Sequence, residues 1–258
     1  MNRFFSCALL CVVVFTACKK DDVKPAYIIN KNKIAEVTDK GITTTLWSDN
    51  KILQSGYNRL YVSLKDGQGN EIKNAAVNYM PVMDMTSMKH GCPAEQPLYN
   101  NGLKLYEGAV VFTMPTSEMG KWELGVSVNG GAVSFPLTID EAPQKRSGVY
   151  VGTDKNKYVL ALVPPVKWQV GLNDLDILIS RQTAMMDFPA AEGLTVEFTP
   201  EMSSMGHGSP NNINPVSVGN GHYKGKVNYT MTGDWRLHFR LKKNDVVIVE
   251  DAYVDVLF

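Results

Sequence analysis

Short runs of alternating hydrophobic and polar residues cover most of the chain, and this pattern is typical of half-buried β-strands. Residues 60–64 (Leu-Tyr-Val-Ser-Leu) alternate in this way and lead into a polar turn at 65–70. Residues 122–126 and 133–137 follow the same pattern, separated by glycines. No segment keeps a helical period over a dozen residues. The pattern therefore predicts an all-β protein.

The order of these runs occurs twice. Residues 56–62 match 171–177, residues 106–114 match 223–231, and a Gly-x-Trp motif ends both series at Trp122 and Trp235. Matches in the same order indicate duplication of one unit. Each unit has about the size of an immunoglobulin-like domain. We therefore expect two tandem immunoglobulin-like β-sandwich domains, at residues 38–141 and 149–258, joined by a linker at 141–148.

The N-terminus has the features of a secretion signal. Arg3 precedes an apolar run at residues 4–15, which is too short to span a membrane. The run ends in Phe-Thr-Ala-Cys18, which resembles the lipobox of bacterial lipoproteins; an ordinary secretory signal is the alternative. This predicts a lipoprotein signal peptide at 1–17, lipidation of Cys18 and a tether at 18–37. The lipid would make the membrane a partner and place the protein in the cell envelope, as an outer-membrane lipoprotein that is periplasmic or surface-exposed.

Charge and cysteine usage narrow the function. The 26 basic and 26 acidic residues balance, and no basic block is present, so nucleic acid is not an expected partner. Cys7 and Cys11 leave with the signal peptide and Cys18 carries the lipid, so Cys92 has no partner for a disulfide. An unpaired thiol in an exported protein is either buried and inert or a metal ligand.

A cluster of methionine and histidine occurs in both halves, at residues 80–93 and 200–210. Thioethers and imidazoles form a soft to borderline ligand set that suits Cu(I). A neutral imidazole binds the metal, so affinity is expected to fall as the pH drops below about 6.5. The predicted metal ligands are Met83, Met85, Met88, His90 and Cys92 in the first half and Met202, Met205 and His207 in the second.

Other assignments for these residues stay open. Methionine is a common gap-filler in cores, and Met114 and Met231 are either distal ligands or core residues. Asp84 and Glu201 flank the clusters and are candidate acceptors for the histidines. Zinc is disfavoured because no Cys/His quartet is present, and the spacing after His90 does not fit a blue-copper loop.

The motifs occur in the order Gly-x-Asn-x-Leu, Pro-x-Met, Met-x-His-Gly, Tyr-x-Gly and Gly-x-Trp, most clearly over residues 200–237. In this order the chain resembles the FixH/YtkA-like β-sandwich family, as a tandem repeat. The resemblance implies an immunoglobulin-like fold and an association with copper handling or oxidase assembly.

No catalytic motif is recognisable, so we do not expect an enzyme. The leading hypothesis is a lipid-anchored copper-binding protein, a Cu(I) chaperone, scavenger or oxidase-assembly factor, which exchanges copper with an envelope protein. The alternative is a non-catalytic immunoglobulin-like scaffold or binding module for a protein or glycan, in which the methionines are structural.

Overall fold

The computed structural model describes residues 29–164 and 167–258. The predicted signal peptide, Cys18 and most of the predicted tether lie outside these residues. Residues 31–258 form one compact unit. The described residues form strands, turns and loops, and among them there is no helix that could cross a membrane. The all-β prediction is confirmed.

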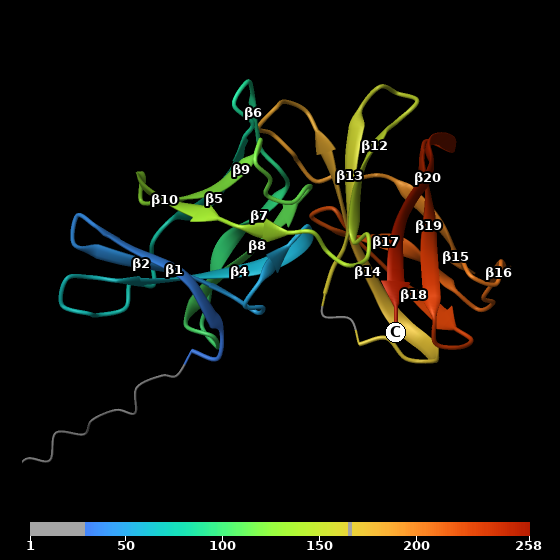
Figure 1. Ribbon diagram of the computed structural model, residues 1–258, viewed down its shortest axis with the longest axis horizontal. Coiled ribbons are helices and arrows are strands. Elements are labelled where there is room, and N and C mark those ends of the chain that lie inside the picture. The colour runs from blue at the N-terminus through green and yellow to red at the C-terminus, as the bar shows by residue number, and fades with distance from the viewer. Residues whose placement is uncertain (1–28, 165–166) are drawn as a thin grey trace, which may run out of the picture. The chain divides into compact units, whose positions relative to one another are not determined.

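The first repeat is built from two antiparallel sheets and one short parallel pair (Figure 1). The first sheet has the order β1-β2-β4-β8-β7, with bounds Asn32–Asp39, Ile42–Ser48, Gly56–Lys65, Leu105–Phe112 and Ala94–Asn100. The second has the order β10-β9-β5-β6, with bounds Gly131–Leu137, Lys121–Val128, Val77–Asp84 and Lys89–His90. The parallel pair is β3 (Leu53–Gln54) with β11 (Ile139–Asp140).

The second repeat has the same two sheets. The five-stranded sheet has the order β12-β13-β14-β18-β17, with bounds Ser147–Val151, Lys157–Leu162, Gly171–Gln182, His222–Tyr229 and Ile213–Gly219. The four-stranded sheet has the order β16-β15-β19-β20, with bounds His207–Gly208, Thr195–Met202, Asp234–Lys243 and Val246–Leu257. Strand by strand, β4 to β10 correspond to β14 to β20. The two repeats are tandem β-sandwiches of immunoglobulin-like type.

Each repeat has its own core between its two sheets. In the first, Leu60 and Val62 of β4 pack with Trp122 and Leu124 of β9. In the second, Trp235 and Leu237 of β19 occupy the corresponding places in a separate cluster. Every second side chain along these strands points into the core, because successive side chains of a strand lie on opposite faces of the sheet. The sequence patterning thus encodes two cores rather than one.

Two polar residues explain part of the repeated motif. Asn58 accepts a hydrogen bond from the Gln54 amide at 3.2 Å and donates to the Gln54 carbonyl at 2.7 Å. Asn173 makes the same pair of bonds with Gln169, at 3.0 and 2.8 Å. The asparagine of Gly-x-Asn therefore closes the loop before β4 and before β14, because its side-chain amide replaces backbone partners.

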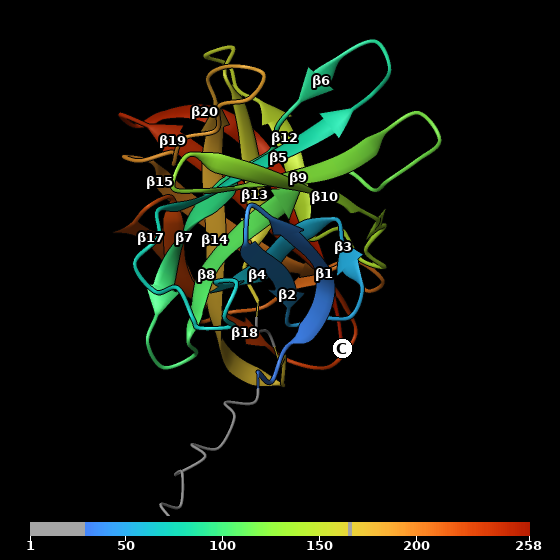
Figure 2. The same cartoon turned by 90° about the vertical axis from the view of Figure 1, so that its left-hand side faces the viewer.

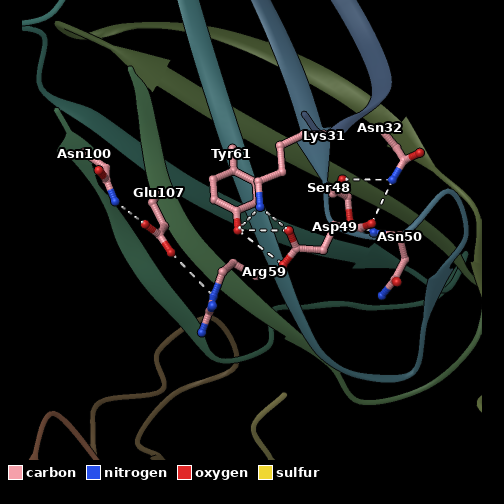
Figure 3. A network of polar contacts seen from close by, with 9 residues as sticks. All are labelled: Lys31, Asn32, Ser48, Asp49, Asn50, Arg59, Tyr61, Asn100 and Glu107. Carbon is pink, nitrogen blue, oxygen red and sulfur yellow. Dashed lines mark hydrogen bonds and ion pairs between the residues drawn. The ribbon is translucent and has the colours of Figure 1, made fainter. Parts of the chain in front are cut away.

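The first strand starts earlier than expected. β1 begins at Asn32, so the predicted tether at 18–37 is wrong for residues 32–37. Lys31 fixes this start: its ammonium contacts Asp49 at 2.5 Å and donates to the Tyr61 hydroxyl at 3.0 Å (Figure 3). The sequence of this segment is polar because the side chains of β1 are exposed or only partly buried, so no apolar pattern indicates the strand. At the linker, β12 begins at Ser147, two residues before the expected start of the second repeat.

Candidate metal centre

In the first repeat, a methionine near the end of β5 lies between a histidine and a tryptophan. Met83 is paired with His90 of β6 on one side and with Trp122 of β9 on the other. Directly opposite residues in antiparallel strands share one face of the sheet, with Cβ atoms about 4.5–5.5 Å apart. The thioether, imidazole and indole therefore gather on the core side, where the β5–β6 hairpin projects beyond the sheet (Figure 2).

The second repeat has the same arrangement. Met202 of β15 is paired with His207 of β16 and with Trp235 of β19. The two clusters that match in sequence therefore also match in strand register. Both repeats place one thioether between one imidazole and one indole at the same end of the four-stranded sheet.

Burial differs between the partners in each trio. Met83 is 1% exposed and Met202 is 3% exposed, and both tryptophans are buried. The two histidines are partly exposed. The imidazole of His90 meets the Trp122 ring edge-on at 5.8 Å between centroids, and His207 meets Trp235 at 5.9 Å. An ion arriving from solvent would therefore meet the imidazole first and the thioether behind it.

One hydrogen bond of His90 determines which ring nitrogen carries the proton. His90 Nδ1 lies 2.9 Å from the Gly91 carbonyl oxygen. A carbonyl oxygen only accepts, so Nδ1 carries the proton in this bond and Nε2 of the neutral ring keeps its lone pair. A histidine that ligates a metal typically holds its other nitrogen in this way. The arrangement leaves Nε2 as the donor atom for an ion.

A glycine in each repeat makes room for the thioether. A β-carbon on Gly120 would lie 2.6 Å from Met83 Cε and 3.2 Å from its Sδ. A β-carbon on Gly233 would lie 2.2 Å from Met202 Cε. These are the glycines of the two Gly-x-Trp motifs. Their lack of a side chain lets the methionine end sit against the backbone next to the tryptophan.

The remaining predicted methionines lie on the two hairpin loops. The Met85 amide donates to the Met88 carbonyl at 2.9 Å, and the Met205 amide donates to the Met202 carbonyl at 3.1 Å. Met85 is partly buried against the first core, whereas Met88 is 51% and Met205 62% exposed. The loops therefore hold extra thioethers near each trio, on the solvent side.

Cys92 is enclosed in the first core. Its thiol is buried, and burial raises its pKa well above the usual range. A metal binds the thiolate, so this group would have to lose a proton in an apolar environment. The role of Cys92 as a ligand stays a prediction.

The flanking acids have other partners. Asp84 pairs with Lys89 at 2.7 Å, and Glu201 lies 3.7 Å from His238 rather than at a cluster histidine. The carbonyl of Met114 accepts a hydrogen bond from the Trp122 indole at 3.0 Å. Met231 does the same for Trp235 at 3.1 Å. The backbone carbonyls of Met114 and Met231 therefore orient the two indoles.

Among the described residues, no group of three or more His, Cys, Asp or Glu side chains is placed to hold a metal ion. The thioethers are therefore the donors that distinguish these two positions. A soft ion that accepts sulfur and one imidazole fits this donor set, whereas a hard ion that needs carboxylates does not.

A separate polar cluster joins the two repeats. His222 of β18 contacts Asp176 at 3.0 Å through Nδ1 and Glu95 of the first repeat at 2.8 Å through Nε2. Hydrogen bonds to Asp176 and then Glu95 raise the pKa of His222 to about 9. Burial alone would raise the pKa of Glu95, but the bonds from His222 and Tyr57 lower it overall. This cluster holds a protonated histidine between two carboxylates.

A cleft of about 730 Å³ adjoins this cluster, and none of the predicted metal ligands lines it. Arg59, Glu107 and Lys224 line it together with apolar residues such as Leu98 and Val218. Basic and acidic groups balance in this lining, so its charge does not favour one class of ligand.

The sequence reasoning missed two methionines that come close to the first cluster. Met185 and Met186 lie in the β14–β15 connection, and the Met185 carbonyl accepts a hydrogen bond from the Gly91 amide at 2.8 Å. Their signal in the sequence is a pair of adjacent methionines in a turn. Because they belong to the other repeat, no spacing rule connects them to His90.

Comparison with known proteins identifies no family. No family model matches the chain, and no curated protein matches it. Three solved structures resemble it at low identity. The Escherichia coli adhesin FdeC is 16% identical, with 87% of this chain and 66% of that chain covered and a TM-score of 0.26. Yersinia pseudotuberculosis InvD is 17% identical, with 80% of this chain and 54% of that chain covered and a TM-score of 0.27. A tandem of titin Ig domains is 11% identical, with 80% of this chain and 90% of that chain covered and a TM-score of 0.20.

The chain spans less than two thirds of the FdeC and InvD structures. All three TM-scores are below 0.5, so the immunoglobulin-like assignment depends on the strand order and the two cores of this chain. What the architecture provides is a tandem β-sandwich scaffold that carries two equivalent Met-His-Trp positions.

Proposed function

We propose that this protein is a non-catalytic binding scaffold of the bacterial cell envelope, anchored by lipid on Cys18, and that the cargo of its two repeats is Cu(I). The observation that carries the proposal is the repeated register in which one methionine lies between one histidine and one tryptophan. A structural methionine needs only apolar neighbours, whereas each of these also faces an imidazole.

The donor set fits Cu(I). Met83 and His90 would supply the thioether and Nε2 in the first repeat, and Met202 and His207 would supply a thioether and an imidazole nitrogen in the second. The indoles of Trp122 and Trp235 close the inner side, and an aromatic face adds electrostatic attraction for a cation. Cu(I) accepts such soft ligands at low coordination number.

The exposed loop methionines suit transfer. Met88 and Met205 are more than half exposed and belong to the same hairpins as the histidines. A partner protein could therefore share the ion with these thioethers while the buried thioether still holds it. This is the geometry expected of a chaperone or scavenger, and an oxidase-assembly factor would use the same exchange. The resemblance to FixH/YtkA-like proteins points the same way.

The test is a Cu(I) titration against a chelator under reducing, oxygen-free conditions. The soluble form begins at Val23 and keeps the whole compact unit of residues 31–258. We expect two equivalents for the unaltered protein, one each for His90→Ala and His207→Ala, and none for the double variant. His238→Ala is the matched control, because that histidine hydrogen-bonds Asp251 and belongs to neither trio. Unchanged binding in the double variant would contradict the proposal.

A second candidate is a scaffold that binds a protein or glycan with structural methionines. The observation that favours it is the apolar edge strand β17, where Ile213, Val216 and Val218 are all more than half exposed, beside the 730 Å³ cleft. Exposed apolar residues on an edge strand often mark a contact surface. If Cu(I) does not bind, substitution of Val216 and Val218 by Ser in a glycan- and peptide-array screen tests this candidate directly.

A further inference from the structure

A tight turn of the second repeat carries two methionines at its tip. The Asp187 amide donates to the Ala184 carbonyl at 3.2 Å, and the Thr183 amide donates to the Asp187 carbonyl at 3.0 Å. Met185 and Met186 are the two central residues of this turn. Turns usually place Gly, Asn, Asp or Pro at such positions, for conformational reasons. Two long apolar side chains at a turn tip therefore need another explanation.

The turn lies against the residue that follows His90 in the first repeat. The Gly91 amide, next to His90, donates to the Met185 carbonyl at 2.8 Å. A β-carbon on Gly91 would lie 3.3 Å from Met186 Cα and 3.5 Å from the Phe188 ring. The backbones of the two repeats therefore touch at the residue that follows the predicted histidine ligand.

The second repeat offers an internal comparison. Gly91 and its counterpart Gly208 each face a proline carbonyl of their own repeat, and a β-carbon on either glycine would lie 3.3 Å from the oxygen of Pro81 or Pro200. Only Gly91 has additional neighbours, and these come from the turn at Met186. The two clusters therefore have the same contacts within their own repeats, but only the first has a contact with the other repeat.

The methionines at the tip are free to act as donors. Met185 is 47% exposed and Met186 is 52% exposed, so neither side chain is buried in the core. Methionine has a flexible, unbranched side chain with a polarizable sulfur, and this adaptability suits a ligand that a neighbouring turn contributes. Met88, 51% exposed, belongs to the hairpin loop of the first repeat.

We infer that the first Cu(I) site is a composite of both repeats, in which Met185 or Met186 adds a thioether to Met83 and His90, so that this site binds Cu(I) more tightly than the site at His207. The inference depends on the proposed function, because it concerns the ligands of the same site. It gives the two repeats different roles, a tight site supported by its neighbour and a weaker site built from one repeat alone.

The test compares leucine variants in the soluble chain from Val23 to Phe258. Met185→Leu/Met186→Leu keeps volume and apolar character but removes both sulfurs. We expect the affinity of the tighter site to fall by at least roughly 10-fold, because a lost ligand should cost no less than the loss of an outer-shell partner of a ligand. The weaker site should be unchanged. Met80→Leu is the control, since Met80 is exposed on β5 and packs against Gly125.

X-ray absorption on His207→Ala, which keeps only the first site, gives a second readout. The number of sulfur scatterers around copper should fall in the variant that also lacks Met185 and Met186. Binding that depends on His90 but shows equal affinity and sulfur count with and without these methionines would overturn the composite site alone. Absence of any binding dependent on His90 would instead overturn the proposed function, and the composite site with it.

Discussion

His222 of the second repeat donates through Nε2 to Glu95 of the first, at 2.8 Å, while its Nδ1 contacts Asp176 of its own sheet. The imidazole thus links the two repeats as a cation between carboxylates. Tyr57 donates to the same Glu95, and Lys224 lies 3.6 Å from Asp176. Beside this cluster, Val111 of the first repeat packs with residues of the second, including Val159 and Leu178.

The pH dependence of stability should report this link. The pKa of His222 is raised from about 6.5 to about 9, so its stabilising effect is complete below about pH 6.5 and is lost as the pH rises through about 9. We expect His222→Gln to lower the free energy of unfolding by about 1.5–3 kcal/mol at pH 6, typical of a hydrogen bond to a charged group. The difference between the two proteins should vanish near pH 10.

Denaturant unfolding at several pH values measures this difference. His238→Gln is the control, because His238 contacts Asp251 within its own repeat. A stability difference for His222→Gln that is equal at pH 6 and pH 10 would show that the charge of His222 does not support the link between repeats.

Gly120→Ala should disturb the first site without removing a ligand. The added carbon would meet Met83 Cε at 2.6 Å, so the thioether must move, at a cost of about 1–3 kcal/mol in stability. We expect the first site to bind Cu(I) more weakly while the second is unaffected. Gly67→Ala is the matched control, since the nearest atom to its β-carbon, the Gly41 carbonyl oxygen, is 3.7 Å away.

The same variant separates the two explanations of Met83. If Met83 is only structural, Gly120→Ala lowers the stability of the protein, and Cu(I) titration finds both sites at their original affinity.

Met202→Leu should keep the fold and lose the second site. Leucine conserves volume in this core, so the free energy of unfolding should change by less than about 1.5 kcal/mol. Chelator competition should then find one Cu(I) equivalent instead of two. If two equivalents remain, the buried thioether is a packing residue and the loop methionines bind the ion.

The Cys92 thiol should be unreactive in the folded, metal-free protein. It is buried and its pKa is raised, so little reactive thiolate is present at neutral pH. We expect alkylation by iodoacetamide to follow unfolding by denaturant, measured by mass spectrometry. Rapid alkylation under native conditions would show that the hairpin opens and that Cys92 is available as a ligand.

Particular residues show how much the sequence could predict. The matched motifs predict the order of the repeats, and Asn58 and Asn173 occupy equivalent positions in β4 and β14, where each side chain bonds the backbone of the preceding loop. The sequence placed Met83 and His90 in one ligand set, and the structure pairs them across the β5–β6 hairpin. Local patterns of this kind are readable because strand periodicity and turns are properties of short segments.

Contacts between the repeats could not be predicted in this way. The contacts of Gly91 with Met185 and of Glu95 with His222 join positions that are 94 and 127 residues apart, and the periodicity of short segments carries no information about such contacts. The early start of β1 was also hidden, because Lys31 secures it through Asp49 rather than through an apolar pattern.

The most direct test is a crystal structure of the copper-loaded protein, with anomalous differences collected at the copper edge. We expect two peaks, one beside Met83 and His90 Nε2 and one beside Met202 and His207. Peaks elsewhere, or none after loading with two equivalents of Cu(I), would contradict the proposed copper sites and leave a tandem immunoglobulin-like scaffold with structural methionines.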